Sequence, residues 1–142
     1  MKVTILCLAI LFLLPVSPWQ RPPAAEAADE KLDAKIPKAD PKKYESVRDA
    51  KEWANPYLIV RAEGIEVVSK GIATGRKVIT TQELRKALAA LPVSAWPYGK
   101  VVAVQEIGIR SAQDEKPIKQ NKKAVKNVLK GLEVEAEWWP AG

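Results

Sequence analysis

The sequence contains no histidine and a single cysteine, and these two scarcities exclude several kinds of chemistry. Histidine is the usual general base near neutral pH and the commonest metal ligand. The cysteine, Cys7, lies in an apolar stretch near the N-terminus, so a chain that loses this stretch has neither a thiol nor a disulfide. Triads that use histidine, thiolate chemistry and zinc sites made of cysteine and histidine are therefore excluded. We expect no metal site and no cofactor.

The rest of the composition is that of one small domain. The chain has 142 residues, of which 47% are hydrophobic and 28% are charged, which is enough to build a core. Lysine and arginine number 23 against 17 aspartates and glutamates, for a formal net charge of +6. This excess favours acidic partners, such as anionic lipid head groups, acidic proteins or polyanions. No glycine-rich phosphate loop or base-stacking platform is present, so nucleic acid is not an expected partner.

Residues 1–27 have the layout of a secretory signal peptide. Lys2 gives a positive start, residues 3–14 carry no charge, and small side chains occupy positions 25 and 27, which a signal peptidase reads. Pro15 cuts the apolar run short of the roughly 20 residues that a spanning helix needs. We therefore expect a periplasmic or secreted protein with no stable membrane span after signal removal. The alternative is an uncleaved anchor, because the stretch after Pro15 is long for a cleavage region.

Two further segments are distinguished by composition. Residues 28–40 are charged and poor in aromatics, which predicts a flexible tether or a spacer that holds the domain away from a membrane. Residues 41–142 are expected to form the domain. Asp40 and Pro41 are suited to the start of a short helix, which a later proline at position 56 would end.

Alternating and continuous apolar runs predict four or five strands. Residues 57–68 alternate on both sides of Gly64, which is typical of a β-hairpin. Residues 77–80 are a short strand candidate. Residues 100–110 begin with a continuous apolar run, which suits a central strand covered on both faces. Residues 133–138 alternate glutamates with apolar side chains, which indicates an edge strand with one solvent-exposed face.

Two helices are predicted between these strands. Thr80 and Glu83 form a capping box, and the apolar face behind it lasts until a proline at position 92. Asp114 and Pro117 open a second helix, for which Gly131 is the expected C-cap. The order of elements predicts an α+β fold: a single small domain with a mixed sheet of four to five strands and two main helices packed on one face.

The second helix carries lysines on the side opposite its apolar face. Such a stripe is usually a solvated surface, and the functional alternative is a docking surface for something acidic. The candidate binding lysines are Lys119, Lys123, Lys126 and Lys130.

A proline-bracketed loop supplies the other candidates. Trp96 and Tyr98 either close one end of the core or form a recognition loop, where aromatics give contact area at low entropy cost. Trp139 falls on the glutamate side of the last strand, so we expect it to be more exposed than Trp138. Glu106 stands in an apolar strand and is expected to pair with Arg110 or Arg61.

The order of hairpin, capped helix, strand, lysine-rich helix and edge strand resembles the periplasmic domain of the ExbD/TolR family, which assists proton-driven energy transfer across the Gram-negative envelope. The similar stretches are residues 58–67, 81–84 and 101–104, a pattern over about 80 residues. The resemblance implies the fold only. That family has a spanning helix with an essential aspartate, whereas the apolar run here contains no acid, so proton coupling and site residues do not carry over.

These observations predict a small exported protein that is not an enzyme and has no catalytic residues. It would bind an unidentified envelope protein or an acidic surface in the periplasm or cell envelope. Two alternatives stay open: a wall- or polyanion-associated protein held by electrostatics alone, and a hydrolase that uses neither histidine nor cysteine. The oligomeric state is left open as well.

Overall fold

The computed structural model describes residues 32, 35–70, 77–107 and 111–140. The predicted signal peptide and the first part of the predicted tether lie outside these residues. So does Arg110, one of the two partners predicted for Glu106.

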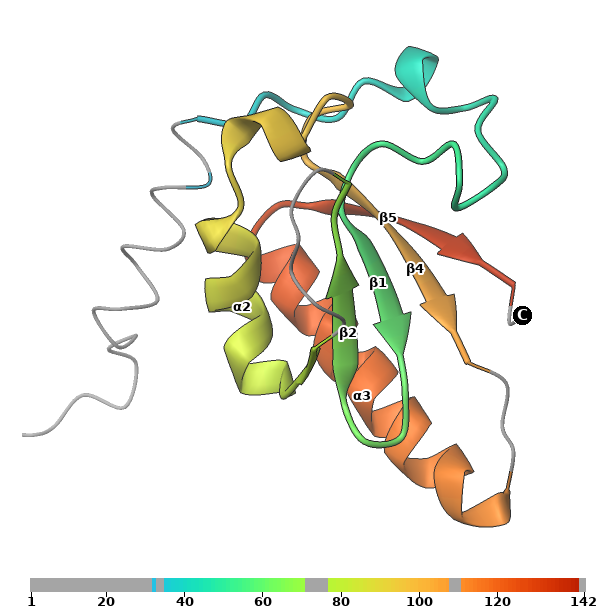
Figure 1. The fold of residues 1–142 in the computed structure, drawn as a ribbon. Helices are drawn as coiled ribbons and strands as arrows, with labels where there is room; N and C mark the ends of the chain where they lie inside the picture. Colours follow the sequence, from blue (N-terminus) through green and yellow to red (C-terminus); the bar gives the residue numbers. More distant parts are fainter. Residues whose placement is uncertain (1–31, 33–34, 71–76, 108–110, 141–142) are drawn as a thin grey trace, which may run out of the picture.

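Five strands form one mixed sheet in the order β3-β2-β1-β4-β5 (Figure 1). The strands are β1 (Tyr57–Val60), β2 (Ile65–Val68), β3 (Val78–Ile79), β4 (Val101–Glu106) and β5 (Glu135–Trp139). Strand β1 is antiparallel to β2 and parallel to β4, and β5 is parallel to β4. The short β3 is antiparallel to β2. The predicted α+β fold is confirmed, with β4 inside the sheet and β5 at its edge.

The predicted hairpin is present, and Gly64 explains its turn. The amide of Arg61 donates to the carbonyl of Gly64 at 2.9 Å, and Gly64 has a φ of 149°, a conformation that favours glycine. A Cβ at this position would lie 2.5 Å from the carbonyl oxygen of Ile79 in the neighbouring strand β3. The glycine therefore allows both the turn and the close approach of β3.

Helices α2 (Thr81–Ala90) and α3 (Ala112–Gly131) cover one face of the sheet (Figure 1). The capping box of α2 is formed, because the Glu83 amide donates to the Thr80 hydroxyl and the Thr80 amide donates to the Glu83 carboxylate. The start and end of α3 differ from the prediction. The helix begins at Ala112 and includes Pro117, and Gly131 is its last helical residue rather than its cap.

The larger core lies between these helices and the sheet. Its fully buried members include Leu58, Val60, Val102 and Val104 from the strands and Leu84, Leu88 and Val125 from the helices. The sheet side chains come from alternate positions of β1 and β4, as a pleated strand requires.

The opposite face of the sheet is covered by residues 35–56, which are almost entirely irregular (Figure 1). The short helix predicted from Asp40 onward is limited to one 3-10 turn, η1 (Pro41–Lys43). Instead of a longer helix, the segment places the single large side chains of Tyr44 and Trp53 against the sheet. The domain also begins before residue 41, because the Asp40 amide donates to Tyr98 and the Lys100 amide donates to Pro37.

Candidate functional site

Strand β5 has an outer edge with no pairing strand among the residues that the structure describes. The amide of Glu135 donates to the carbonyl of Lys100 at 2.9 Å, and Glu135 is in register with Val101. Alternate residues of a strand direct their peptide groups to opposite edges. The N–H and C=O groups of Ala136 and Trp138 therefore point outward, away from β4.

The side chains of β5 divide between the two faces of the sheet. Glu135, Glu137 and Trp139 lie on the face covered by residues 35–56, because they are in register with Val101, Ala103 and Gln105. Ala136 and Trp138 lie on the helical face and pack against its core.

A pocket of about 540 Å³ lies beside this edge, between β5 and the segment around η1. Aromatic, acidic and basic side chains surround it. Its lining consists of Pro41, Tyr44, Glu45, Arg48, Glu135, Glu137, Trp138, Trp139 and Pro140. Charged and aromatic side chains thus meet in one hollow beside the strand edge, and its surface is more polar than apolar.

The floor of this region is an aromatic cluster centred on Trp53. The ring centroid of Trp53 lies 5.6 Å from that of Tyr44, 5.2 Å from that of Tyr98 and 5.5 Å from that of Trp139. In all three pairs the rings pack edge to face. The Trp53 Nε1 donates to the carbonyl of Pro56 at 3.1 Å. Trp139 also lies 5.6 Å from the ring of Tyr57. Trp139 is thus half-buried in the cluster, rather than standing free beside the glutamates as its alternation suggested.

Tyr44 connects the covering segment to the edge strand. Its hydroxyl donates to the Glu135 carboxylate at 3.1 Å. The pKa of Tyr44 is raised to about 12, mainly by burial, together with the hydrogen bond to Glu135 and the negative charges of Glu135, Glu137 and Asp40. The pocket side of β5 is therefore an acidic environment.

This pKa predicts a loss of stability in alkali. The unfolded chain releases the tyrosine proton near pH 10, whereas folded Tyr44 holds it to about pH 12. The stabilisation is complete below pH 10 and is lost as the pH rises from 10 to 12. Relative to Tyr44→Phe, the wild type should lose about 2 kcal/mol of unfolding free energy by pH 11.5, at about 1.4 kcal/mol for each pH unit above 10. Urea unfolding at pH 8 and pH 11.5 measures this, and parallel losses in both proteins would contradict it.

On the helical side, lysines from α3 cover Trp138. The Nζ atoms of Lys122 and Lys126 lie 5.1 and 5.0 Å from the centroid of the Trp138 ring, within cation–π distance. Lys122 also forms an ion pair with Glu106. The predicted partner Arg61 instead pairs with Glu66 at 2.7 Å. Helix α3 lies against β5 and β1, and from there Lys122 reaches the carboxylate of Glu106.

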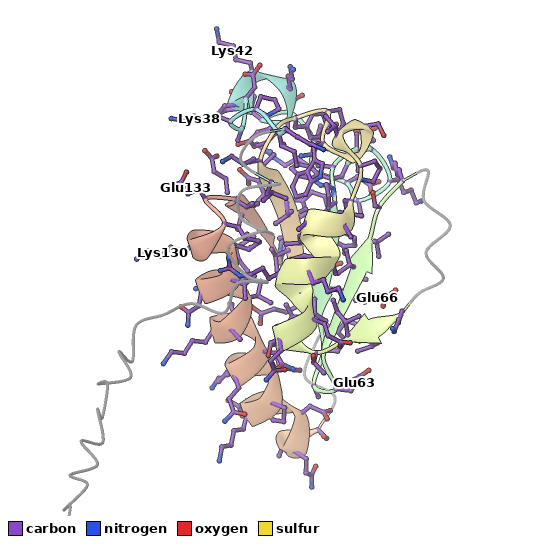
Figure 2. All side chains as sticks on the ribbon, turned by 90° about the vertical axis from the view of Figure 1, so that its left-hand side faces the viewer. Lys38, Lys42, Glu63, Glu66, Lys130 and Glu133 are labelled. Atoms are coloured by element: carbon purple, nitrogen blue, oxygen red, sulfur yellow. The ribbon has the colours of Figure 1, made fainter. Side chains whose placement is uncertain are left out.

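The predicted binding lysines all lie on the exposed side of α3. Lys119, Lys123, Lys126 and Lys130 are exposed, and Lys119 pairs with Glu115 one turn earlier. Figure 2 shows Lys130 pointing away from the helix into solvent. A shallow hollow of about 460 Å³ lies along this helix beside Lys119 and Lys123. Of the four, only Lys126 is also placed beside β5, through its contact with Trp138.

The two aromatics of the predicted recognition loop lie on opposite faces of the sheet. Trp96 is 2% exposed and belongs to the core under the helices. Tyr98 is half-buried in the aromatic cluster on the other face. The burial of Trp96 supports the interpretation that this loop closes the core and leaves that ring no surface for a partner.

Tyr44, Arg48 and Lys122 are placed at the β5 edge although the sequence pattern does not single them out. Tyr44 and Arg48 come from a segment far from β5 in the sequence, and Lys122 lies on α3, which directly precedes β5. The signal that does exist is the alternation of β5 itself, which marks it as an edge strand.

Neither a metal site nor a membrane span is found among the described residues. Residues 32, 35–70, 77–107 and 111–140 contain no group of three or more carboxylate or thiol side chains placed to hold a metal ion. No helix within these ranges is long and apolar enough to cross a membrane.

No protein-family model, curated protein or solved structure matches this chain. The resemblance to the ExbD/TolR domain therefore has no support beyond the order of elements.

Proposed function

We propose that this chain is a small non-catalytic binding domain of the periplasm or cell envelope, which captures an extended segment of a partner protein along the outer edge of β5. The observation that carries the proposal is the combination of an unpaired strand edge, within the described residues, and a pocket directly beside it. An extended peptide that adds to a sheet edge gains affinity from main-chain hydrogen bonds and specificity from pockets for alternate side chains.

The edge is built for such a partner in two respects. Strand β5 is five residues long, and its outward N–H and C=O groups at Ala136 and Trp138 offer main-chain hydrogen bonds. Trp138 and Trp139 then point to opposite faces, so the partner strand would meet an aromatic ring on each side.

The export of the domain rests on the sequence of its N-terminus, where a charge-free run after Lys2 and small residues at 25 and 27 support secretion. If the domain is exported, its partner must also be in the periplasm or cell envelope. The lysines of α3 support the alternative of a polyanion or wall component held by charge alone, because they form an exposed basic side.

The substitution Ala136→Pro tests strand addition. The Ala136 amide points away from β4, so proline removes a donor from the open edge and keeps the bonds between β4 and β5. Peptides selected from a displayed random library should bind the wild type, shift the amide signals of β5 in NMR spectra, and bind the variant at least tenfold more weakly. Thermal unfolding of the variant shows that it is folded.

Lys123→Ala is the matched control, because this exposed lysine lies on α3 away from the pocket lining. The control should bind the same peptides as the wild type does. A different result would contradict strand addition: the selected peptides shift only the amide signals of α3, bind the proline variant as tightly as the wild type, and dissociate in 0.5 M salt. Binding would then be driven by the charge of the lysines.

A further inference from the structure

We infer that the segment captured by β5 carries alternating charges, with lysine or arginine side chains facing the pocket and aspartate or glutamate side chains facing α3. This inference rests on the proposed function and specifies the chemistry of its partner. Its basis is that the two faces of the same strand edge have opposite charge.

The pocket side is predominantly acidic. Glu135 and Glu137 project from β5 on this side, and Glu45 joins them from the covering segment, against the single basic side chain of Arg48 in the lining. Burial is the main cause of the high pKa of the Tyr44 hydroxyl, and the charges of Glu135 and Glu137 raise it in the same direction. A basic side chain on a paired strand would reduce this excess of negative charge.

The helical side is basic. Lys122 and Lys126 place their ammonium groups over Trp138, whose neighbours along β5 point to the other face. Glu106 neutralises Lys122, whereas Lys126 is exposed beside the ring. An acidic side chain on the paired strand would therefore meet net positive charge on this side.

The distances of strand pairing allow these contacts. Side chains directly opposite one another on paired strands have Cβ atoms about 5 Å apart, and opposite charges at this distance stabilise the pairing. Because side chains alternate between faces, one partner strand meets both environments at once. The partner pattern is therefore basic, acidic, basic, acidic along the chain.

The same charges argue against a second copy of this chain as the occupant. Two β5 strands paired antiparallel in a continuous sheet would keep their pocket sides on one face. Glu135 and Glu137 of one copy would then stand opposite the same glutamates of the other. Like charges directly opposite one another destabilise a strand pair, so self-pairing is disfavoured.

Two fluorescently labelled eight-residue peptides of identical composition test the inference. One alternates lysine with glutamate, and the other has four lysines followed by four glutamates. Fluorescence anisotropy at physiological salt should give at least tenfold tighter binding for the alternating peptide. The substitution Glu137→Lys should weaken this binding at least tenfold, because it places a positive charge opposite the basic side chains.

A third peptide restores the pairing. It replaces the lysines of the alternating peptide with glutamine, and it should bind Glu137→Lys more tightly than the alternating peptide does. Glu63→Lys is the charge-matched control, because this exposed glutamate lies in the turn between β1 and β2 (Figure 2). The control should leave the preference for the alternating peptide unchanged.

The outcomes separate this inference from the proposed function. Equal binding of the alternating and block peptides, lost in both cases by Ala136→Pro, would overturn the charge pattern and leave strand addition in place. Peptide binding that Ala136→Pro does not weaken would overturn strand addition itself. Concentration-dependent dimers of the wild type in sedimentation velocity that Ala136→Pro abolishes would make a second copy the occupant and overturn the inference.

Discussion

Replacement of Asn55 by alanine is expected to destabilise the domain by about 2–6 kcal/mol, the largest effect of any single polar substitution that we predict. Asn55 is 1% exposed. Its Nδ2 donates to the carbonyls of Gly99 and Val101, each at 2.7 Å, and its Oδ1 accepts from the Tyr98 amide at 2.8 Å. Alanine leaves the Tyr98 amide and the Val101 carbonyl without these partners, whereas the Gly99 carbonyl still accepts from the Val101 amide at 2.8 Å. Each buried polar group left unpaired costs about 1–3 kcal/mol.

Urea unfolding followed by tryptophan fluorescence measures this effect. Asn127→Ala is the matched control, because Asn127 is exposed on α3 and should change the free energy of unfolding by no more than about 0.5 kcal/mol. Asn55→Asp keeps the acceptor but replaces the two donated bonds with a buried charge, so it should be as damaging as alanine. A stability of Asn55→Ala equal to that of the control would show that water replaces all three bonds.

Trp53→Ala is expected to cost about 3–5 kcal/mol, the usual range for removing a buried aromatic side chain. Trp53 is 2% exposed and contacts three rings of the aromatic cluster, so alanine leaves a cavity that Tyr44, Tyr98 and Trp139 line. Because Trp139 belongs to both this cluster and the pocket lining, the substitution should also disturb the β5 edge.

Trp53→Phe separates the two contributions of this residue. It keeps one aromatic ring in the cluster, but it removes the bond from Nε1 to the Pro56 carbonyl and part of the volume of the indole, so it should lose clearly less stability than alanine. Val93→Ala is the control for a change of side-chain size, because Val93 is 49% exposed. If Trp53→Ala unfolds at the same urea concentration as Val93→Ala, residues 35–56 contribute little to the stability of the domain.

The sequence is sufficient to predict those elements whose signals are local. The turn at Gly64 and the capping box of Thr80 and Glu83 depend on residues within a few positions of each other, and both form as expected. The edge position of β5 follows from its own alternation. These signals also account for the fold, because short connections leave few arrangements of the strands.

The second face of the sheet was not predictable in the same way. Its cluster gathers Tyr44, Trp53, Tyr98 and Trp139 from distant parts of the chain, and no periodicity connects them. The segment that carries the first two has no regular secondary structure beyond η1, so neither a period of two nor one of 3.6 is present in it. The candidate site was hidden for the same reason, since half of its lining belongs to this segment.

The loop that follows α2 sends Trp96 into one layer of the domain and Tyr98 into the other. This one loop therefore contributes to both hydrophobic layers, the core under the helices and the aromatic cluster, which the sheet separates. If either hydrophobic layer unfolds, the loop moves, and both Trp96 and Tyr98 lose their packing. The consequence is cooperativity: the covering segment and the helices should unfold in one transition, so that the β5 edge retains its shape until the whole domain is lost.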